Sequence, residues 1–228
     1  MKQTTFFVLL LAGVNAMAFS LQEIWLSTGF EFGNSIETSS DKGTAYIGAP
    51  GFNLNGYSFS DKRNIGVFFH CSALFPVIVN GNENVEEYDV QSEFIIGPGF
   101  KYNITEKLKL QFGIGIDWIH NWAAYNKNID GDTVDFTKSA YNFGAGGDIG
   151  VKYDVTEFFY INGGVTLSYM FYNHTRVYSS KKTSNVEEIR TRIYDGNIKG
   201  YSMLGIKPYI CIGVNSYQEK SVWGKPKE

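Results

Sequence analysis

After its first 18 residues the sequence has no apolar run that approaches the length of a membrane-spanning helix, and its mean hydropathy is −0.17. A bundle of transmembrane helices is therefore excluded, because each helix needs about 20 apolar residues. Proline is scarce, with 5 residues, and there are only two cysteines. The net charge of −3 is too small to indicate a nucleic-acid-binding protein.

Glycine and aromatic residues are abundant. The chain has 25 glycines among 228 residues, and Phe, Trp and Tyr together make up 16%. With so little proline, this composition favours strands and tight turns over helices. The length is enough for one or two domains.

The N-terminal segment has the three regions of a secretory signal peptide. Lys2 supplies the positive charge, Phe6 to Val14 is an apolar stretch, and Ala16-Met17-Ala18 matches a small-residue cleavage site. Residues 1–18 are therefore expected to be removed on export; a buried N-terminal helix is the alternative. No cysteine follows the cleavage site, so a lipid anchor is not expected there.

Eight segments alternate between apolar and polar side chains with the period of two that is typical of strands. They are Glu23–Gly33, Ala45–Phe59, Ile65–Val77, Phe94–Asn103, Leu108–His120, Tyr141–Tyr153, Phe158–Tyr172 and Gly200–Asn215. The second is the least regular, since Gly, Pro and Asn blur its phase. We predict an all-β fold: an eight-stranded antiparallel up-and-down transmembrane β-barrel over residues 19–215, followed by a polar periplasmic tail, 216–228.

The connections between these segments alternate in length. Three are short polar turns: Asp61-Lys62-Arg63, Thr105-Glu106-Lys107 and Thr156-Glu157. Four are long: Asn34–Thr44, Ile78–Val90, Asn121–Ser139 and Asn173–Lys199. Barrels of the bacterial outer membrane have this asymmetry, with short periplasmic turns and long external loops. Both termini are then expected on the periplasmic side, because the number of strands is even.

Alternation does not by itself decide which face of the sheet is outside, since a lipocalin-like soluble barrel is equally periodic. Three features favour the transmembrane alternative: the loop asymmetry, the glycine-rich polar face that a narrow interior requires, and aromatic residues near both ends of the apolar face. Two such girdles flank a lipid-facing band in membrane barrels. They would be Tyr102, Tyr153 and Phe159 at the turn end, and Trp118, Tyr141, Tyr169 and Phe171 at the loop end.

Two strand-and-turn units, Gly97 to Leu108 (GPGFKYNITEKL) and Val151 to Phe158 (VKYDVTEF), carry a resemblance to a known class. With them the mature chain resembles the small outer-membrane barrels of the OmpX, OmpA and OmpW kind, and more narrowly the eight-stranded outer-membrane barrels of spirochaetes. The likeness implies an outer-membrane location. Its OmpW side implies a narrow channel for small hydrophobic molecules or ions. Such barrels end on an aromatic residue that serves as an assembly signal, whereas this chain continues into Ser216–Glu228.

Strand parity places four acidic and four basic side chains on the inward face of the predicted barrel. Buried charges need oppositely charged or hydrogen-bonding partners. We therefore expect a salt-bridged, largely closed lumen, and the alternative is a gated, narrow ion path. The eight residues are Glu31, Glu93, Asp117, Asp148, Lys101, Lys109, Lys152 and Lys207.

Two neighbouring residues, His70 and Ser72, share the inward face of one strand. A serine hydrolase needs a histidine within hydrogen-bond distance of the serine and an acid behind it. Because this pair points into the lumen, away from lipid substrate, we expect it to serve packing. No catalytic residue is predicted, and the protein is not expected to be an enzyme.

No metal site or cofactor is predicted either. Asp130, Asp132 and Asp135 match only part of a calcium loop, and Asp-Gly is ordinary turn chemistry. His120 and His174 lie near external strand ends without a partner that would complete a zinc site. Cys71 and Cys211 face opposite sides of the sheet, so they are expected to be free thiols.

The predicted external loops differ in charge, with only acids in residues 78–90 and an excess of bases in 173–199. Within the latter, Val186–Tyr194 is expected to extend the last two strands beyond the membrane. Long loops on a rigid scaffold often carry binding. The leading hypothesis is thus a monomeric, non-enzymatic barrel in contact with outer-membrane lipid, whose loops serve envelope integrity or bind a surface ligand or host partner.

Overall fold

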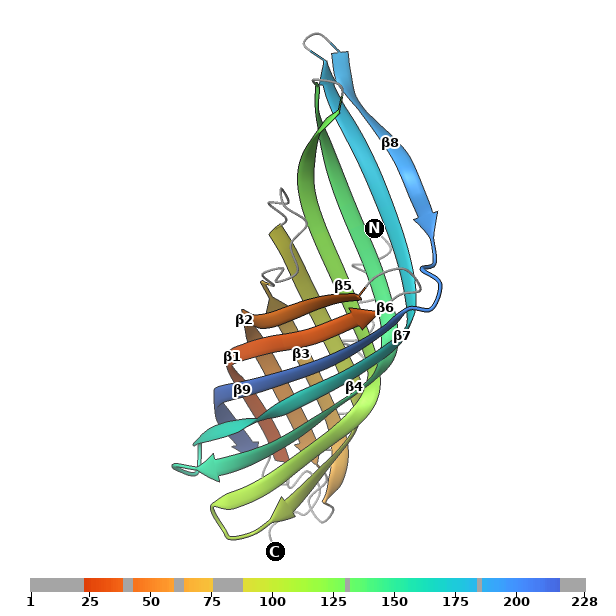
Figure 1. Cartoon of the computed structure of the whole chain (residues 1–228). Coiled ribbons are helices and arrows are strands. Elements are labelled where there is room, and N and C mark those ends of the chain that lie inside the picture. Colours follow the sequence, from red (N-terminus) through yellow and green to blue (C-terminus); the bar gives the residue numbers. More distant parts are fainter. Residues whose placement is uncertain are drawn as a thin grey trace, which may run out of the picture.

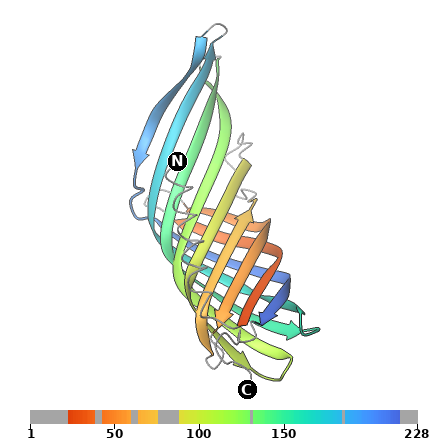
Figure 2. The same ribbon diagram turned by 180° about the vertical axis from the view of Figure 1, so that it is seen from behind.

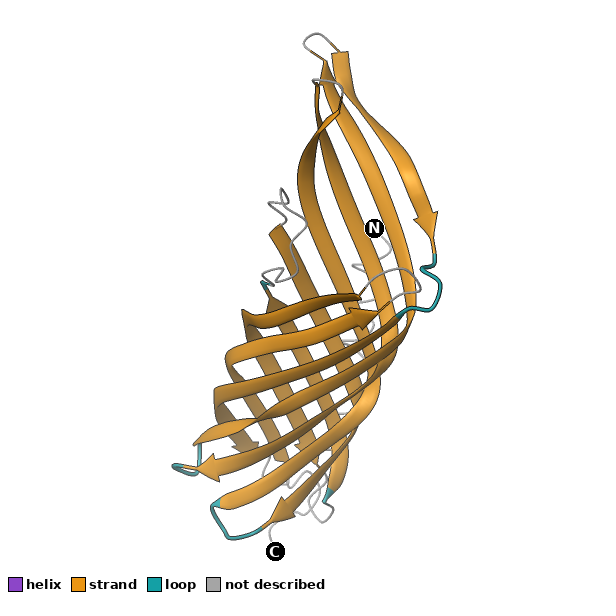
Figure 3. Ribbon diagram, viewed as in Figure 1, coloured by secondary structure: helices purple, strands orange, loops and turns teal. Residues whose placement is uncertain are grey.

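The computed structural model describes residues 23–38, 43–59, 64–75, 88–129, 132–183 and 186–217. The predicted signal peptide, residues 1–18, lies outside this part, as does the predicted tail from residue 218 onward. The described residues form nine strands and no helix (Figure 3): β1 Glu23–Thr38, β2 Gly43–Phe59, β3 Ile65–Leu74, β4 Tyr88–Asn103, β5 Leu108–Ile129, β6 Asp132–Asp154, β7 Phe159–Thr183, β8 Val186–Gly196 and β9 Ser202–Tyr217. Accordingly, no helix there is long and apolar enough to cross a membrane.

Eight of these strands close into one antiparallel barrel. Each strand from β1 to β7 pairs with the next, β9 pairs with β7, and β9 returns to pair with β1 (Figures 1 and 2). The ring therefore has no free edge around its circumference, so its backbone N–H and C=O groups are satisfied within the sheet. The predicted eight-stranded, up-and-down barrel is confirmed.

The chain enters and leaves the barrel at the end that carries the short turns. Glu23, the first residue of β1, pairs with both Phe59 and Tyr217. Two of the short turns are built alike. The Thr105 hydroxyl accepts a hydrogen bond from the backbone N–H of Leu108 at 2.9 Å, and Thr156 does the same for Phe159 at 2.9 Å. A threonine hydroxyl that caps a tight turn explains the repeated Thr-Glu pair.

The two faces of the barrel wall have the polarity that lipid requires. Inward side chains include Glu31, His70 and Lys207, each 0% exposed, whereas outward ones include Ile212 at 70% and Ile114 at 60%. A water-soluble barrel would have the reverse arrangement. The structure therefore excludes the lipocalin-like alternative and defines a transmembrane barrel.

Three of the strands are much longer than the membrane requires. β5, β6 and β7 have 22, 23 and 25 residues, whereas about 9–11 tilted residues span a bilayer. Their upper parts form a curved sheet that rises from one side of the barrel rim (Figure 1). The prediction of long loops over Asn121–Ser139 and Asn173–Lys199 was thus wrong in most of both segments. Ladder hydrogen bonds between β5, β6 and β7 satisfy these polar stretches without lipid burial.

The remaining strand, β8, completes this sheet. It contains Val186–Tyr194, the segment expected to extend the strands beyond the membrane. It pairs with β7 from Thr175 upward, on the edge where β9 pairs lower down. Between β8 and β9 the chain turns at Gly200, whose φ of +63° favours glycine. We call residues 121–129 of β5, 132–140 of β6, 173–183 of β7 and all of β8 the outer sheet.

The inverted polarity can be tested with a charge on the outer wall. Ile114→Arg, in the middle of the lipid-facing band, should reduce the free energy of unfolding in liposomes by about 2–4 kcal/mol, because arginine is costly near the bilayer midplane. Ile193→Arg, on exposed β8, should have little effect. Urea titration of both variants measures the difference, and equal effects would contradict the assignment of the faces.

Candidate functional site in the barrel interior

The interior of the barrel is filled with side chains arranged in successive layers. From the short-turn end toward the outer sheet these are a lysine layer, an aromatic layer, a carboxylate layer and an apolar cap. All eight charged residues that parity places inward lie on the inner face of the barrel. Seven of them belong to the lysine layer or the carboxylate layer, and Asp148 lies between these two layers.

The lysine layer pairs with acids that were not among the eight. Lys101 bonds to Glu23, Lys109 reaches Asp154 Oδ2 at 2.7 Å, and Lys152 bonds to Asp154 Oδ1. The Asn215 amide also donates to Asp154, at 2.9 Å. Glu23 begins the predicted strand Glu23–Gly33 and has inward parity, but it was not included among the inward charges; Asp154 lies one residue beyond the predicted strand Tyr141–Tyr153, and extending that strand by parity would have found it.

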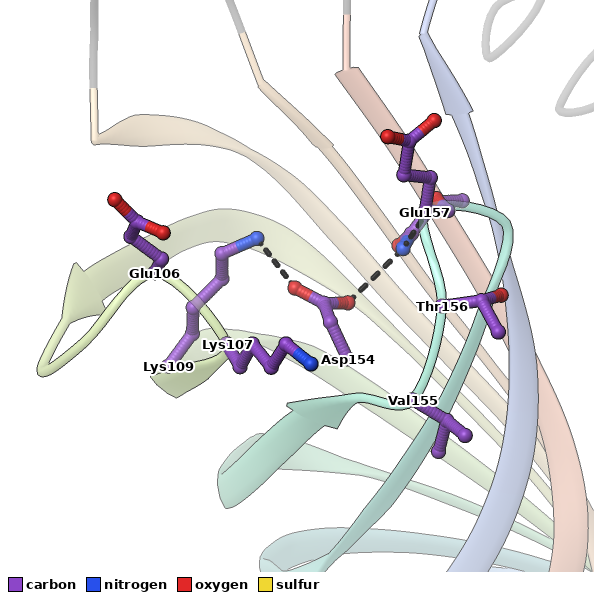
Figure 4. A pocket seen from close by; sticks show the side chains of 8 residues that line it. Glu106, Lys107, Lys109, Asp154, Val155, Thr156 and Glu157 are labelled. Atoms are coloured by element: carbon purple, nitrogen blue, oxygen red, sulfur yellow. Dashed lines mark hydrogen bonds and ion pairs between the residues drawn. The ribbon is translucent and has the colours of Figure 1, made fainter.

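A pocket of about 510 Å³ opens at this end of the barrel. Figure 4 shows Asp154 at its centre, bonded to Lys109, with the turn residues Glu106, Lys107 and Glu157 around the rim. Asn215 also lines the pocket. The pocket is a vestibule at the turn end. Lys109 of the lysine layer lines it, and the aromatic layer lies beyond.

The inner aromatic cluster consists of Trp25, Tyr57, Phe59, Phe68, Ile95 and Tyr160. The Lys152 ammonium lies 4.4 Å from the ring centres of Trp25 and Tyr160, so the two layers are joined by cation–π contacts. Glycines on neighbouring strands make room for two of these rings. A Cβ at Gly113 would overlap the ring of Phe68, and one at Gly213, the cross-strand partner of Tyr160, would overlap Tyr160. The glycine-rich inner face therefore accommodates large side chains within a narrow interior.

Next to this cluster, Asp148 is held by neutral donors. The hydroxyl of Tyr57 donates to Asp148 Oδ2, and the Gln111 amide donates to the same oxygen at 3.2 Å. Gln111 also donates to the Tyr209 hydroxyl at 2.9 Å. No lysine forms an ion pair with Asp148 within the described residues.

The third layer contains one ammonium and several carboxylates. Lys207 donates to Glu93 Oε1 and, at 2.8 Å, to the Ser168 hydroxyl. The imidazole Nε2 of His70 lies 3.5 Å from Glu31 Oε2 and 3.6 Å from Glu93 Oε2. Asp117 is fully buried in this half of the lumen and interacts electrostatically with Lys207. Both glutamates and the histidine were placed inward by parity, but their convergence is a product of the fold.

The outer apolar cluster closes the lumen toward the outer sheet. Ile119, Met170 and Met203 are at most 1% exposed, and Tyr201 packs against them from the segment that joins β8 to β9. Together with the aromatic layer, it encloses the carboxylate layer between two apolar layers. The sequence did not predict this cap: Tyr201 has the same parity as the inward Met203, but parity does not show that both side chains meet Ile119 and Met170.

A serine-hydrolase triad would need His70 or His120 to contact both a serine and a carboxylate. Ser72 donates to Glu93 at 3.3 Å, and His70 shares its Nδ1 with Asn55 at 2.5 Å. His120 Nε2 lies 2.8 Å from the Ser139 hydroxyl at the outer rim, yet no ion pair joins His120 to a carboxylate among the described residues. Neither histidine therefore has the serine and the acid that a triad needs.

The predicted interface aromatics lie on the outer wall. Tyr102, Tyr153 and Phe159 are exposed near the short turns, and Tyr169 and Phe171 are exposed toward the rim. Trp118 and Tyr141 are half-buried there, and the Tyr141 ring stacks on His120 at 4.6 Å.

Other candidates from the sequence are dispersed. Asp130 lies outside the described residues, and Asp135 is exposed on β6 opposite Ser180. Cys71 and Cys211 are both free, which confirms that prediction. His174 contacts Asp195 at 2.9 Å on the outer sheet. The slight desolvation of Asp195 opposes, but does not outweigh, the hydrogen bond and charge of Arg176, so the pKa of Asp195 lies below its usual value.

The fold and interior together define the class: an eight-stranded transmembrane β-barrel of the outer-membrane type with a filled lumen. No protein-family model and no curated sequence matches the chain. Among solved structures it is similar to a major outer membrane protein from Thermus thermophilus, with 11% identity, a TM-score of 0.54, and coverage of 82% of this chain and 98% of that one. The attachment invasion locus protein Ail of Yersinia pestis matches 86% of this chain and 99% of its own, at 14% identity and a TM-score of 0.46.

The lysine layer leads to a stability prediction. Asp154→Asn leaves Lys109 and Lys152 without their shared carboxylate, and this should lower the free energy of unfolding by about 3 kcal/mol, as for other broken ion pairs that are largely buried. Asp195→Asn, which removes a multiply paired but solvent-exposed aspartate, should change it little. Urea unfolding in detergent micelles compares the two, and a small loss in Asp154→Asn would show that the pairing is not needed.

Proposed function

We propose that the chain is a monomeric, non-enzymatic protein of the bacterial outer membrane that presents its outer sheet to the surroundings and does not conduct. The observation that carries the proposal is the combination of a lumen filled in every layer with a folded sheet standing on one rim. A channel would keep its interior open for passage; here the interior serves to hold the wall rigid. The part of the chain left for recognition is the outer sheet.

The outer sheet has the properties of a contact surface. On β8, Ile193 is 54% exposed, beside the exposed Tyr194 and Arg192. Arg192 lies 5.9 Å from the ring of Tyr178 and donates to Asp195 at 2.7 Å, so its guanidinium is held in place. Aromatic and arginine side chains on an ordered scaffold are typical of binding surfaces. These features support a surface ligand or partner in contact with β8.

The alternative, a narrow OmpW-like passage for small hydrophobic molecules or ions, has one observation in its favour. The outer end of the lumen is apolar at Ile119, Met170 and Met203, as such a passage would require. These side chains are buried against one another, so passage would need them to move apart.

Conductance in planar bilayers separates the two functions. The refolded mature protein should give no current steps above background, because its lumen is filled. A comparator with Phe68→Ala and Ile119→Ala, which removes one side chain from each apolar layer, should give a measurable leak and so prove the sensitivity of the assay. Steps well above background from the unaltered protein would overturn the closed-lumen proposal in favour of passage.

Proteolysis of intact cells tests the location and orientation. Trypsin added outside should cut after Arg192 in the outer sheet or after Lys199 in the segment that joins β8 to β9, since both residues are exposed. Lys107, in a short turn at the opposite end, should be cut only after the outer membrane is made permeable. Mass spectrometry of the fragments identifies the sites, and cleavage at Lys107 in intact cells would reverse the orientation.

A further inference from the structure

We propose that Glu31, His70 and Glu93 form a buried site for one divalent transition-metal ion, with Zn²⁺ as the reference ion. The three side chains come from β1, β3 and β4, and one ligand atom of each lies within 4.8 Å of the other two. β2 separates β1 from β3 in the wall, so a bound ion would tie together strands that do not pair.

The distances suit a metal better than hydrogen bonds. Ligand atoms about 2.0–2.2 Å from a tetrahedral ion are roughly 3.3–3.6 Å apart. His70 Nε2 is 3.5 Å from Glu31 Oε2 and 3.6 Å from Glu93 Oε2, which places both pairs in this range. One imidazole with two carboxylates is a donor set that Zn²⁺ and its neighbours in the first transition row accept.

Glu31 and His70 offer ligand atoms that lack hydrogen-bond partners, whereas Glu93 Oε2 accepts from the Ser72 hydroxyl at 3.3 Å. Both carboxylate oxygens of Glu31 and the Nε2 of His70 are buried without one, and both residues are 0% exposed. A buried carboxylate in this condition is costly, because its desolvation is not offset. These orphaned atoms converge, and a single cation placed between them satisfies them together.

A second set of residues prepares His70 as a ligand. Its Nδ1 lies 2.5 Å from Asn55 Oδ1, while the Asn55 amide nitrogen donates to Cys211 Sγ at 3.8 Å. The Cys211 thiol in turn donates to Asn53 Oδ1 at 2.9 Å. This chain of contacts makes Asn55 Oδ1 the acceptor, so the imidazole proton sits on Nδ1 and the Nε2 lone pair faces the two glutamates. Histidine ligands of metals are commonly oriented in this way.

The composition of the carboxylate layer agrees with a divalent ion. Three acidic side chains, Glu31, Glu93 and Asp117, are buried there with Lys207 and His70. A divalent cation between Glu31, His70 and Glu93 would supply positive charge where acidic groups outnumber basic ones. Asp148 lies one layer closer to the short turns and already accepts from Tyr57 and Gln111.

The site is sealed by the aromatic layer on one side and by the outer apolar cluster on the other. We therefore expect the ion to enter during folding and to be retained afterwards. The test is to refold the mature chain in detergent micelles with Zn²⁺ or Co²⁺, remove free metal with a chelator and gel filtration, and measure bound metal by mass spectrometry. One ion per chain should remain, with the visible absorption of four-coordinate Co²⁺.

Variants locate the ion within the chain. Glu31→Gln and His70→Gln should weaken binding by more than about 100-fold, and Asn55→Ala, which leaves the three ligands in place, by about 10- to 100-fold. His120→Gln, His174→Gln and Asp148→Asn should bind as the unaltered protein does. If His70→Gln does not fold, X-ray absorption of the zinc-loaded protein must show a single imidazole ligand with oxygen donors.

Three results would overturn the proposal: no retained metal in the unaltered protein, undiminished binding by a folded His70→Gln variant, or loss of binding in His120→Gln or His174→Gln. Conductance is measured separately on metal-loaded and metal-free protein. A conducting protein that still holds its ion at His70 would refute the closed lumen while leaving the metal site intact.

Discussion

The structure depends on one constraint: within hydrocarbon every backbone N–H and C=O must find a partner inside the protein. In this chain the constraint is met by closing eight strands on themselves, with β9 joining β1 to β7. Closure with eight strands leaves an interior only wide enough for side chains. The polar residues that cannot face lipid must therefore satisfy one another in a narrow space, and this shapes the whole interior.

That space is divided by the sizes of the side chains as much as by their charges. Trp25, Phe59 and Phe68 occupy the lumen between the lysines and the carboxylates, and glycines at positions 99 and 113 leave room for Phe68. Ion pairing therefore occurs within layers: Lys109 with Asp154 near the turns, and Lys207 with Glu93 farther out. The surplus of carboxylates around His70 follows from this separation, because the lysines of the first layer cannot reach it.

Above the membrane the constraint is relaxed, since water can bond to an open sheet edge. There β5, β6 and β7 continue as a ribbon, and β8 pairs on one side with β7 alone among the described strands. The open edge of β8 carries exposed apolar and basic side chains that a partner could contact. The sealed interior, in contrast, can hold only an ion that was enclosed during folding. The two proposed roles, surface contact and ion binding, thus belong to separate parts of one molecule.

Local patterns in the chain were sufficient for the number of strands in the barrel and their two faces, because a period of two assigns each residue to a side regardless of its distant neighbours. The inverted polarity followed from loop lengths, inward glycines and the aromatic residues near the strand ends. They could not decide which inward residues meet. Glu31, His70 and Glu93 are far apart in the chain and converge through the register of their strands, and Tyr201 likewise meets Ile119 and Met170 only in the folded barrel. The extent of the outer sheet was likewise decided by ladder pairing, since stretches such as residues 121–129 have no regular apolar alternation to mark them as strands. Which strands pair along their full length, and which inward side chains meet, are decided by the closed barrel and cannot be read from local sequence patterns.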